Sequence, residues 1–209
     1  MTVLGRLLPA LAALGLSCAA QARDVTVQVR DASGRPVADA VAMLDAPGRA
    51  PPPGHFRIDQ KNTMFMPFML VIPVGSTVEF TNLDPFRHHV YSFSASKKFE
   101  LKLFGQGETR AVTFDKPGIV ALGCNIHDTM QAFIRVVDTP FAVKTGNDGR
   151  AVLRGAPDGA VNLHVWHPHL RAPGNQLSVQ VGAGGAVTVP VSVKLRQPAP
   201  MQHDYRAGG

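Results

Sequence analysis

Glycine and proline interrupt this chain so often that long helices have little room. The sequence contains 20 glycines and 17 prolines among 209 residues, spread along its whole length. Proline lacks the backbone donor that a helix interior needs, and glycine favours turns. Hydrophobic residues make up 45% and charged residues 17%, a balance that allows a buried core and excludes a disordered or coiled-coil chain. We therefore predict an all-β protein built from many short strands joined by turns.

The first 22 residues have the pattern of a secretory signal peptide. A positive Arg6 precedes an apolar run from Leu7 to Leu16, and the small-x-small pattern of Ala20-Gln21-Ala22 follows it. This order is typical of a segment that signal peptidase removes during export. We therefore expect a mature periplasmic chain that begins at Arg23.

A lipid anchor is the alternative interpretation of the same segment. Lipid attachment at Cys18 needs a leucine three residues earlier, where this chain has Gly15, so we favour export without an anchor. The apolar run is too short to span a membrane, and no later stretch approaches the length of a transmembrane helix. The net charge is +6, about +5 after removal of the signal, and the basic residues are spread out rather than clustered with aromatics. We therefore expect no nucleic-acid partner.

Strand patterns and a proline-rich loop divide the mature chain. Residues 24–46 alternate apolar and polar positions on either side of a turn at Asp31-Ala-Ser-Gly, which predicts two strands. The run Pro51-Pro-Pro-Gly cannot lie inside a sheet and closes this first segment. The expected parts are the strands of 23–54, a middle segment at 55–138, a third β segment at 139–196 and a loose tail at 197–209.

The middle segment contains several strand-like runs at close intervals. The expected strands lie within 69–82 and at 88–93, 110–114, 118–123 and 132–137. None of these runs has the length or the spacing of a helix. Short strands in such close succession favour a sandwich or a barrel.

The segments that flank the middle resemble one known family. Gly34-Arg-Pro-Val-Ala-Asp-Ala-Val, Asp148-Gly-Arg-Ala-Val-Leu and Pro157-Asp-Gly-Ala-Val-Asn-Leu are similar to the opening and middle of the carboxypeptidase-regulatory-like, transthyretin-like β-sandwich. In that family the two halves follow one another closely, whereas about 90 residues separate them here, and a long insertion in a loop costs little extra entropy. The resemblance thus implies a second small Ig-like or transthyretin-like sandwich into which the middle segment is inserted.

Cys124 is the only cysteine of the expected mature chain, because Cys18 is lost with the signal peptide. An unpaired thiol in an oxidising compartment is buried, joined to another chain or held by a metal. The run Cys124-Asn-Ile-His-Asp-Thr-Met places Cys124, His127 and Met130 at the spacing C-x2-H-x2-M. A strand that delivers Cys124 and a short loop that returns can bring the three side chains to one point. Such soft ligands suit copper.

A further histidine ligand is expected from a separate strand. The segment 80–91 offers the adjacent candidates His88 and His89. Because neighbouring residues of a strand point to opposite faces, we expect only one of the two to face the metal. Strand alternation alone does not decide between His88 and His89.

The order of one histidine followed by Cys-His-Met in a tight loop is similar to the cupredoxins, with a loop spacing like that of amicyanin. The resemblance covers residues 56–137, and the register of Asn82 before His88-His-Val identifies His88 as the ligand. It implies a Greek-key β-sandwich that holds one type 1 copper ion. The implied ligands are His88, Cys124, His127 and Met130. The whole chain is also similar to a periplasmic group named methylamine utilisation proteins, in which Gly-Cys-Asn-Ile-His-Asp recurs.

Three positions depart from the cupredoxin pattern. His89 occupies the place of an asparagine that usually braces the cysteine-bearing loop. Asn125-Ile126 replaces the usual proline or glycine, which predicts a less rigid loop. Asp128 adds a carboxylate beside His127, where many cupredoxins present an apolar docking patch, so we expect a different partner preference.

The resemblance implies a periplasmic one-electron carrier that docks transiently on redox partner proteins through His127. With no coordination position open to a substrate, we expect no enzymatic activity and no catalytic residue. Two alternatives remain. One is a copper-holding or delivery protein assisted by the methionines Met64, Met66 and Met69, and the other is a non-redox β-sandwich binding module. A histidine cluster near His167 and His169 lacks an accompanying acid or cysteine and is expected to be structural, with Trp166 in the core of the outer sandwich.

Overall fold

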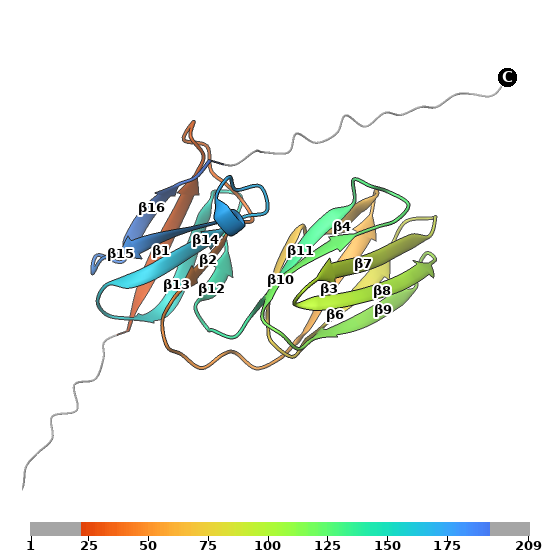
Figure 1. Ribbon diagram of the computed structural model, residues 1–209, viewed down its shortest axis with the longest axis horizontal. Coiled ribbons are helices and arrows are strands. Elements are labelled where there is room, and N and C mark those ends of the chain that lie inside the picture. The colour runs from red at the N-terminus through yellow and green to blue at the C-terminus, as the bar shows by residue number, and fades with distance from the viewer. Residues whose placement is uncertain (1–21, 193–209) are drawn as a thin grey trace, which may run out of the picture.

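The computed structural model describes residues 22–192, and almost every regular element in this part is a β-strand (Figure 1). The elements are β1 Ala22–Arg30, β2 Val41–Leu44, β3 His55–Lys61, β4 Met64–Met66, β5 Met69–Pro73, β6 Ser76–Asn82, β7 His88–Ser94, β8 Lys97–Phe104, β9 Thr109–Phe114, β10 Gly118–Gly123, β11 Gln131–Val137, β12 Ala142–Lys144, β13 Arg150–Pro157, β14 Val161–Trp166, the short 3-10 helix η1 Pro173–Asn175, β15 Gln176–Val181 and β16 Ala186–Pro190. The predicted all-β fold class is confirmed. The expected signal peptide, apart from Ala22, and the expected tail lie outside the described residues. Within the described part, no helix is long and apolar enough to cross a membrane.

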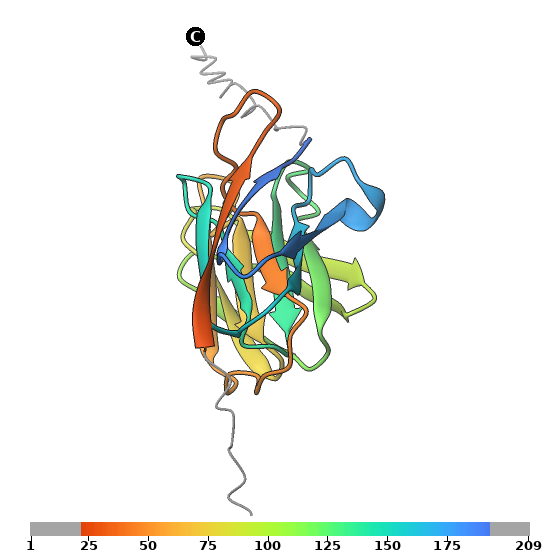
Figure 2. The ribbon, with the colours of Figure 1, turned by 90° about the vertical axis from the view of Figure 1, so that its left-hand side faces the viewer.

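Four sheets form two β-sandwiches that lie side by side (Figure 1). The inner sandwich pairs the sheet β5-β11-β10-β7-β8 with the sheet β4-β3-β6-β9. The outer sandwich pairs β13-β1-β16 with β12-β2-β14-β15. Its strands come from both sides of the inner sandwich in the sequence, so the inner sandwich is inserted into the outer one, as the sequence predicts. The parallel pairing of β1 with β16 joins the two ends of the described chain (Figure 2).

The first two strands do not pair with each other, although the turn between them forms as predicted. The Gly34 N–H donates to the Asp31 carbonyl at 2.9 Å, and the Asp31 carboxylate accepts the N–H groups of Ser33 and Arg35. However, β1 lies between β13 and β16, whereas β2 lies between β12 and β14 in the opposite sheet. The turn is therefore part of an arch between two sheets. A hairpin and an arch both bury one face of each strand, so the alternation of apolar and polar residues does not distinguish between them.

Each sandwich has its own hydrophobic core, and a smaller cluster joins the two. The inner core is built around Phe80, Phe104 and Phe114, which are fully buried. The joining cluster centres on Val41, Met69 and Trp166. Trp166 contacts Phe133 of the inner sandwich edge to face, with 5.8 Å between ring centroids. The expectation that Trp166 lies in the outer core is therefore wrong: its ring packs between the sandwiches.

A close contact between β7 and β10 fixes the end of the inner sandwich that carries the candidate metal ligands. Gly123, the last residue of β10, pairs with Tyr91 of β7. A Cβ at Gly123 would lie 2.6 Å from Cζ of the Tyr91 ring, a contact too short for any side chain. Glycine thus allows the tyrosine ring to lie against the backbone immediately before Cys124.

Candidate metal centre

The loop between β10 and β11 carries three of the predicted ligands. Cys124 follows directly after β10 and is only 3% exposed, and Met130 precedes β11 and is 1% exposed. The Met130 N–H donates to the His127 carbonyl at 2.9 Å, which closes a turn inside the loop. The loop therefore leaves the end of one strand and returns to the next, as the spacing predicts.

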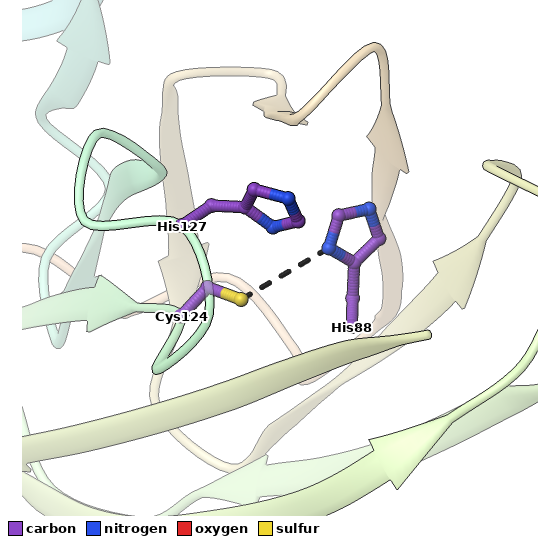
Figure 3. A group of neighbouring side chains, drawn as sticks. All are labelled: His88, Cys124 and His127. Atoms are coloured by element: carbon purple, nitrogen blue, oxygen red, sulfur yellow. Dashed lines mark hydrogen bonds between the residues drawn. The ribbon is translucent and has the colours of Figure 1, made fainter. Parts of the chain in front are cut away.

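His88, the first residue of β7, meets this loop from the neighbouring strand. One donor atom each from His88, Cys124 and His127 lies within 4.8 Å of the other two. Nδ1 of His88 is 3.9 Å from Sγ of Cys124, and both imidazole rings face the thiol (Figure 3). Within residues 22–192 this is the one group of three or more His, Cys, Asp or Glu side chains with such a geometry. The predicted cluster near His167 and His169 therefore forms no such group.

His89 turns away from the thiol. Its Nε2 lies 2.9 Å from the Glu100 carboxylate and 3.5 Å from the side-chain nitrogen of Asn125. The alternation of side chains along β7 thus brings His88 to Cys124 and directs His89 to the opposite face. His89 nevertheless reaches the cysteine-bearing loop through Asn125.

The donor set has the chemistry of a copper site. Nδ1 of His127 is buried and has no hydrogen-bond partner among the described residues, a costly state that a metal ion would relieve. Burial lowers the pKa of His127, and the nearby His88 lowers it further against the opposing effect of Asp84. A low pKa favours the neutral imidazole, which is the form that binds metals. Two imidazole nitrogens and a thiolate are ligands that copper prefers.

Met130 belongs to the same buried cluster as Cys124. Both side chains also line a pocket that is bordered by Tyr91 and Phe133. Met130 therefore lines the same pocket as Cys124, and its role as the fourth ligand stays a prediction.

The surface around His127 is more apolar than Asp128 led us to expect. Phe86 is 43% exposed, and its ring centroid lies 5.5 Å from that of His127. Leu83 and Ile126 are also exposed. Asp128 is exposed in the same loop, so a carboxylate and an apolar surface occur together.

Two buried polar residues near this end of the inner sandwich are not predicted from the sequence. Asp84 contacts His88, and the only available signal is its position four residues before that histidine. Gln60 on β3 is fully buried, and neither polar atom of its side-chain amide has a partner among the described residues. Nothing in the sequence around Gln60 distinguishes it from an ordinary strand residue.

These features define an all-β chain with a buried His-Cys-His group at one end of its inserted sandwich. No protein-family model matches it, and no curated protein does. Solved structures are similar over part of the chain. A copper-containing nitrite reductase from Thermus scotoductus is 31% identical over 52% of this chain, with a TM-score of 0.38, and the match spans 28% of the reductase.

Two smaller proteins are matched over most of their own length. A purple cupredoxin from Nitrosopumilus maritimus is 24% identical over 39% of this chain and 98% of its own, with a TM-score of 0.35. Amicyanin from Paracoccus versutus is 20% identical over 44% of this chain and 86% of its own, with a TM-score of 0.37.

Proposed function

We propose that this protein is a periplasmic copper protein that carries one electron at a time between redox partners. The proposed site is a single type 1 copper centre with the ligands His88, Cys124, His127 and Met130. One observation carries the proposal: donor atoms of two histidines and the lone described cysteine lie within 4.8 Å of one another at a buried strand end. The resemblance of residues 56–137 to the cupredoxins supports the same conclusion.

The residues of the chain hold the ligands in place before any metal binds. Copper, when bound, supplies the one-electron exchange between Cu(II) and Cu(I). Gly123, the residue before Cys124, pairs with β7 and β11, and His88 pairs with Phe104 of β8, so strand pairing restrains the backbone at both positions. A site fixed in this way changes little between oxidation states, which keeps electron exchange fast. With the ligands supplied by side chains, no position is left for a substrate, and we infer a carrier rather than an enzyme.

Partners are proposed to dock over His127. Exposed apolar side chains flank it there: Phe86 packs against the His127 ring, and Ile126 precedes His127 in the chain. A reduced partner delivers one electron at this surface, and an oxidised partner later removes it. A small contact area suits the weak, short-lived complexes of electron transfer.

The proposal is tested by loading the chain with Cu(II) and following its reduction by voltammetry. We expect one copper ion per chain and a reversible one-electron couple. A chain that binds no copper, or one whose copper is lost on every reduction, contradicts the carrier function.

The second candidate function is copper holding and delivery. Met64 and Met66 lie on the outer face of β4 and are 52% and 49% exposed. Thioethers favour Cu(I), so this pair offers a place where that ion could be exchanged. Transfer of Cu(I) to a chelator separates the two functions. A carrier retains its ion, whereas a delivery protein releases it readily. In a delivery protein, the double variant Met64→Leu with Met66→Leu should slow this release.

A further inference from the structure

Asp84 is a buried carboxylate that contacts the side of the His88 ring facing away from Cys124. Its Oδ2 lies 2.7 Å from Nε2 of His88, and the two side chains are 6% and 0% exposed. A carboxylate out of reach of water keeps its charge only when hydrogen bonds replace the lost hydration. The partners of Asp84 therefore decide whether it carries a charge.

The turn between β3 and β4 supplies those hydrogen bonds. The N–H of Asn62 donates to Oδ1 of Asp84 at 2.7 Å, and the N–H of Thr63 donates to Oδ2 at 3.0 Å. Asn62 and Thr63 have φ angles of 54° and 55°, in the left-handed region that residues other than glycine rarely adopt. Two consecutive residues in this conformation present both N–H groups to one carboxylate, which offsets the strain of the turn.

The segment that carries Asp84 is fixed as well. The Asp84 N–H donates to the side-chain oxygen of Asn82 at 2.9 Å. The side-chain nitrogen of Asn82 in turn donates to the carbonyl groups of Phe86 and Phe104. Burial alone raises the pKa of Asp84, but the hydrogen bonds from Thr63, His88 and Asn62 together bring that pKa below its usual value. The N–H groups of Asn62 and Thr63 and Nε2 of His88 thus give this carboxylate three hydrogen-bond partners, which replace the water that an anion loses on burial.

We propose that Asp84 is a positioning residue of the metal centre, which orients His88 through Nε2 and places a buried negative charge that favours oxidised copper. The proposal rests on the proposed function, because it concerns the same site. When Nε2 of His88 carries the proton and donates to Asp84, Nδ1 is left with a free lone pair directed at the Cys124 thiol. Because Cu(II) carries one more positive charge than Cu(I), a negative charge one imidazole away stabilises the oxidised state more.

The variant Asp84→Asn tests this role, because it keeps the size of the side chain and removes its charge. We expect Cu(II) affinity to fall by about tenfold or more, in the range typical of such outer hydrogen bonds, with a smaller change for Cu(I). The same difference appears as a rise in the reduction potential. Asp84→Glu keeps the charge and should give a potential closer to the wild type. A purely structural Asp84 would lower the melting temperature and leave the potential unchanged.

Glu100→Gln is the matched control, because Glu100 makes the equivalent contact with His89, which does not face the thiol. Its potential should stay close to that of the wild type, and a shift as large as that of Asp84→Asn contradicts the proposal. Nitrogen NMR of the metal-free chain tests the orientation separately: His88 should be protonated at Nε2 in the wild type and lose this preference in Asp84→Asn. A wild-type chain that binds no copper overturns the proposed function and the charge effect, whereas an unchanged His88 tautomer in Asp84→Asn overturns the positioning role alone.

Discussion

Two adjacent histidines with different surroundings are the most informative residues of the candidate site. His88 is fully buried between Asp84 and Cys124, whereas His89 contacts Glu100 at the edge of the same sheet. The two side chains leave β7 on opposite faces, next to an irregularity in its pairing with β8 between His88 and Val90. Only one of them can therefore share a metal ion with Cys124.

Replacement of each histidine in turn tests this assignment. We expect His88→Ala to abolish stoichiometric copper binding, because it removes one of three clustered donors. His89→Ala should still bind one copper ion, although with a looser Cys124 loop because the contact with Asn125 is lost. Metal content after dialysis measures both outcomes. Loss of copper in His89→Ala with retention in His88→Ala would reverse the assignment.

The sequence predicted the cluster itself but not the residues around it. The spacing from Cys124 to Met130 predicts a tight loop, since three residues that can bind a metal seldom fall within seven positions by chance. Asp84 was not predicted because its hydrogen-bond donors come from a turn about twenty residues earlier in the chain. The N–H groups of residues 62 and 63, between β3 and β4, both donate to its carboxylate. Gln60 was missed because burial of a strand residue depends on which face the sheet covers.

At the scale of elements, the strands were easier to predict than their partners. β10 begins and ends at the predicted residues, and β7, β9 and β11 differ by one residue at an end. The pairing of β1 with β13 and β16 could not be predicted, because it joins segments more than 100 residues apart. β8 was not predicted either, because charged residues alternate with apolar ones along it. It forms an edge of its sheet, where lysines discourage pairing with a further strand.

The contact between Gly123 and Tyr91 gives a prediction about β10. Gly123→Ala should destabilise the fold by about 1–3 kcal/mol, because the added methyl group must displace the tyrosine ring. Gly105→Ala is the control, since nothing lies within 4 Å of a Cβ at that position. Urea denaturation of both variants measures the difference. Equal stabilities would show that the ring moves aside without cost.

The segment that follows β14 predicts a dependence of stability on pH. Burial, with the neighbouring His169, lowers the pKa of His167 to about 4 from the model-compound value of 6.5. Between these two values the unfolded chain binds a proton that the folded chain excludes, so stability falls as pH decreases from about 6.5 to about 4. His167→Gln should flatten this part of the profile, as measured by thermal unfolding. An unchanged slope would mean that His167 is protonated in the folded protein.

At the scale of the whole molecule, the protein has two hydrophobic cores and one joining cluster, and Cys124 belongs to the core of the inner sandwich. The inner sandwich carries the candidate metal centre, and the outer sandwich contacts its β5 and β11 side through Trp166. The candidate centre lies at the strand ends, in the β10–β11 loop and at the start of β7, away from this contact (Figure 1).

The separate inner core predicts that residues 55–138 form a folding unit. Produced alone, this segment should unfold cooperatively, because its core residues contact one another rather than the outer sandwich. Its melting temperature should be lower than that of the full chain, because Phe133 loses its contact with Trp166. Calorimetry compares the two. Aggregation of the segment without a cooperative transition would mean that the sandwiches share one core.

The existence of a thiolate-ligated copper centre is tested most directly by the visible absorption and paramagnetic resonance spectra of the Cu(II)-loaded chain, recorded for the wild type and for Cys124→Ser. We predict an intense thiolate-to-copper band and a narrow copper hyperfine splitting in the wild type, both absent from the variant. A colourless wild type whose spectra match those of Cys124→Ser would contradict the electron-carrier function and leave a β-sandwich binding module.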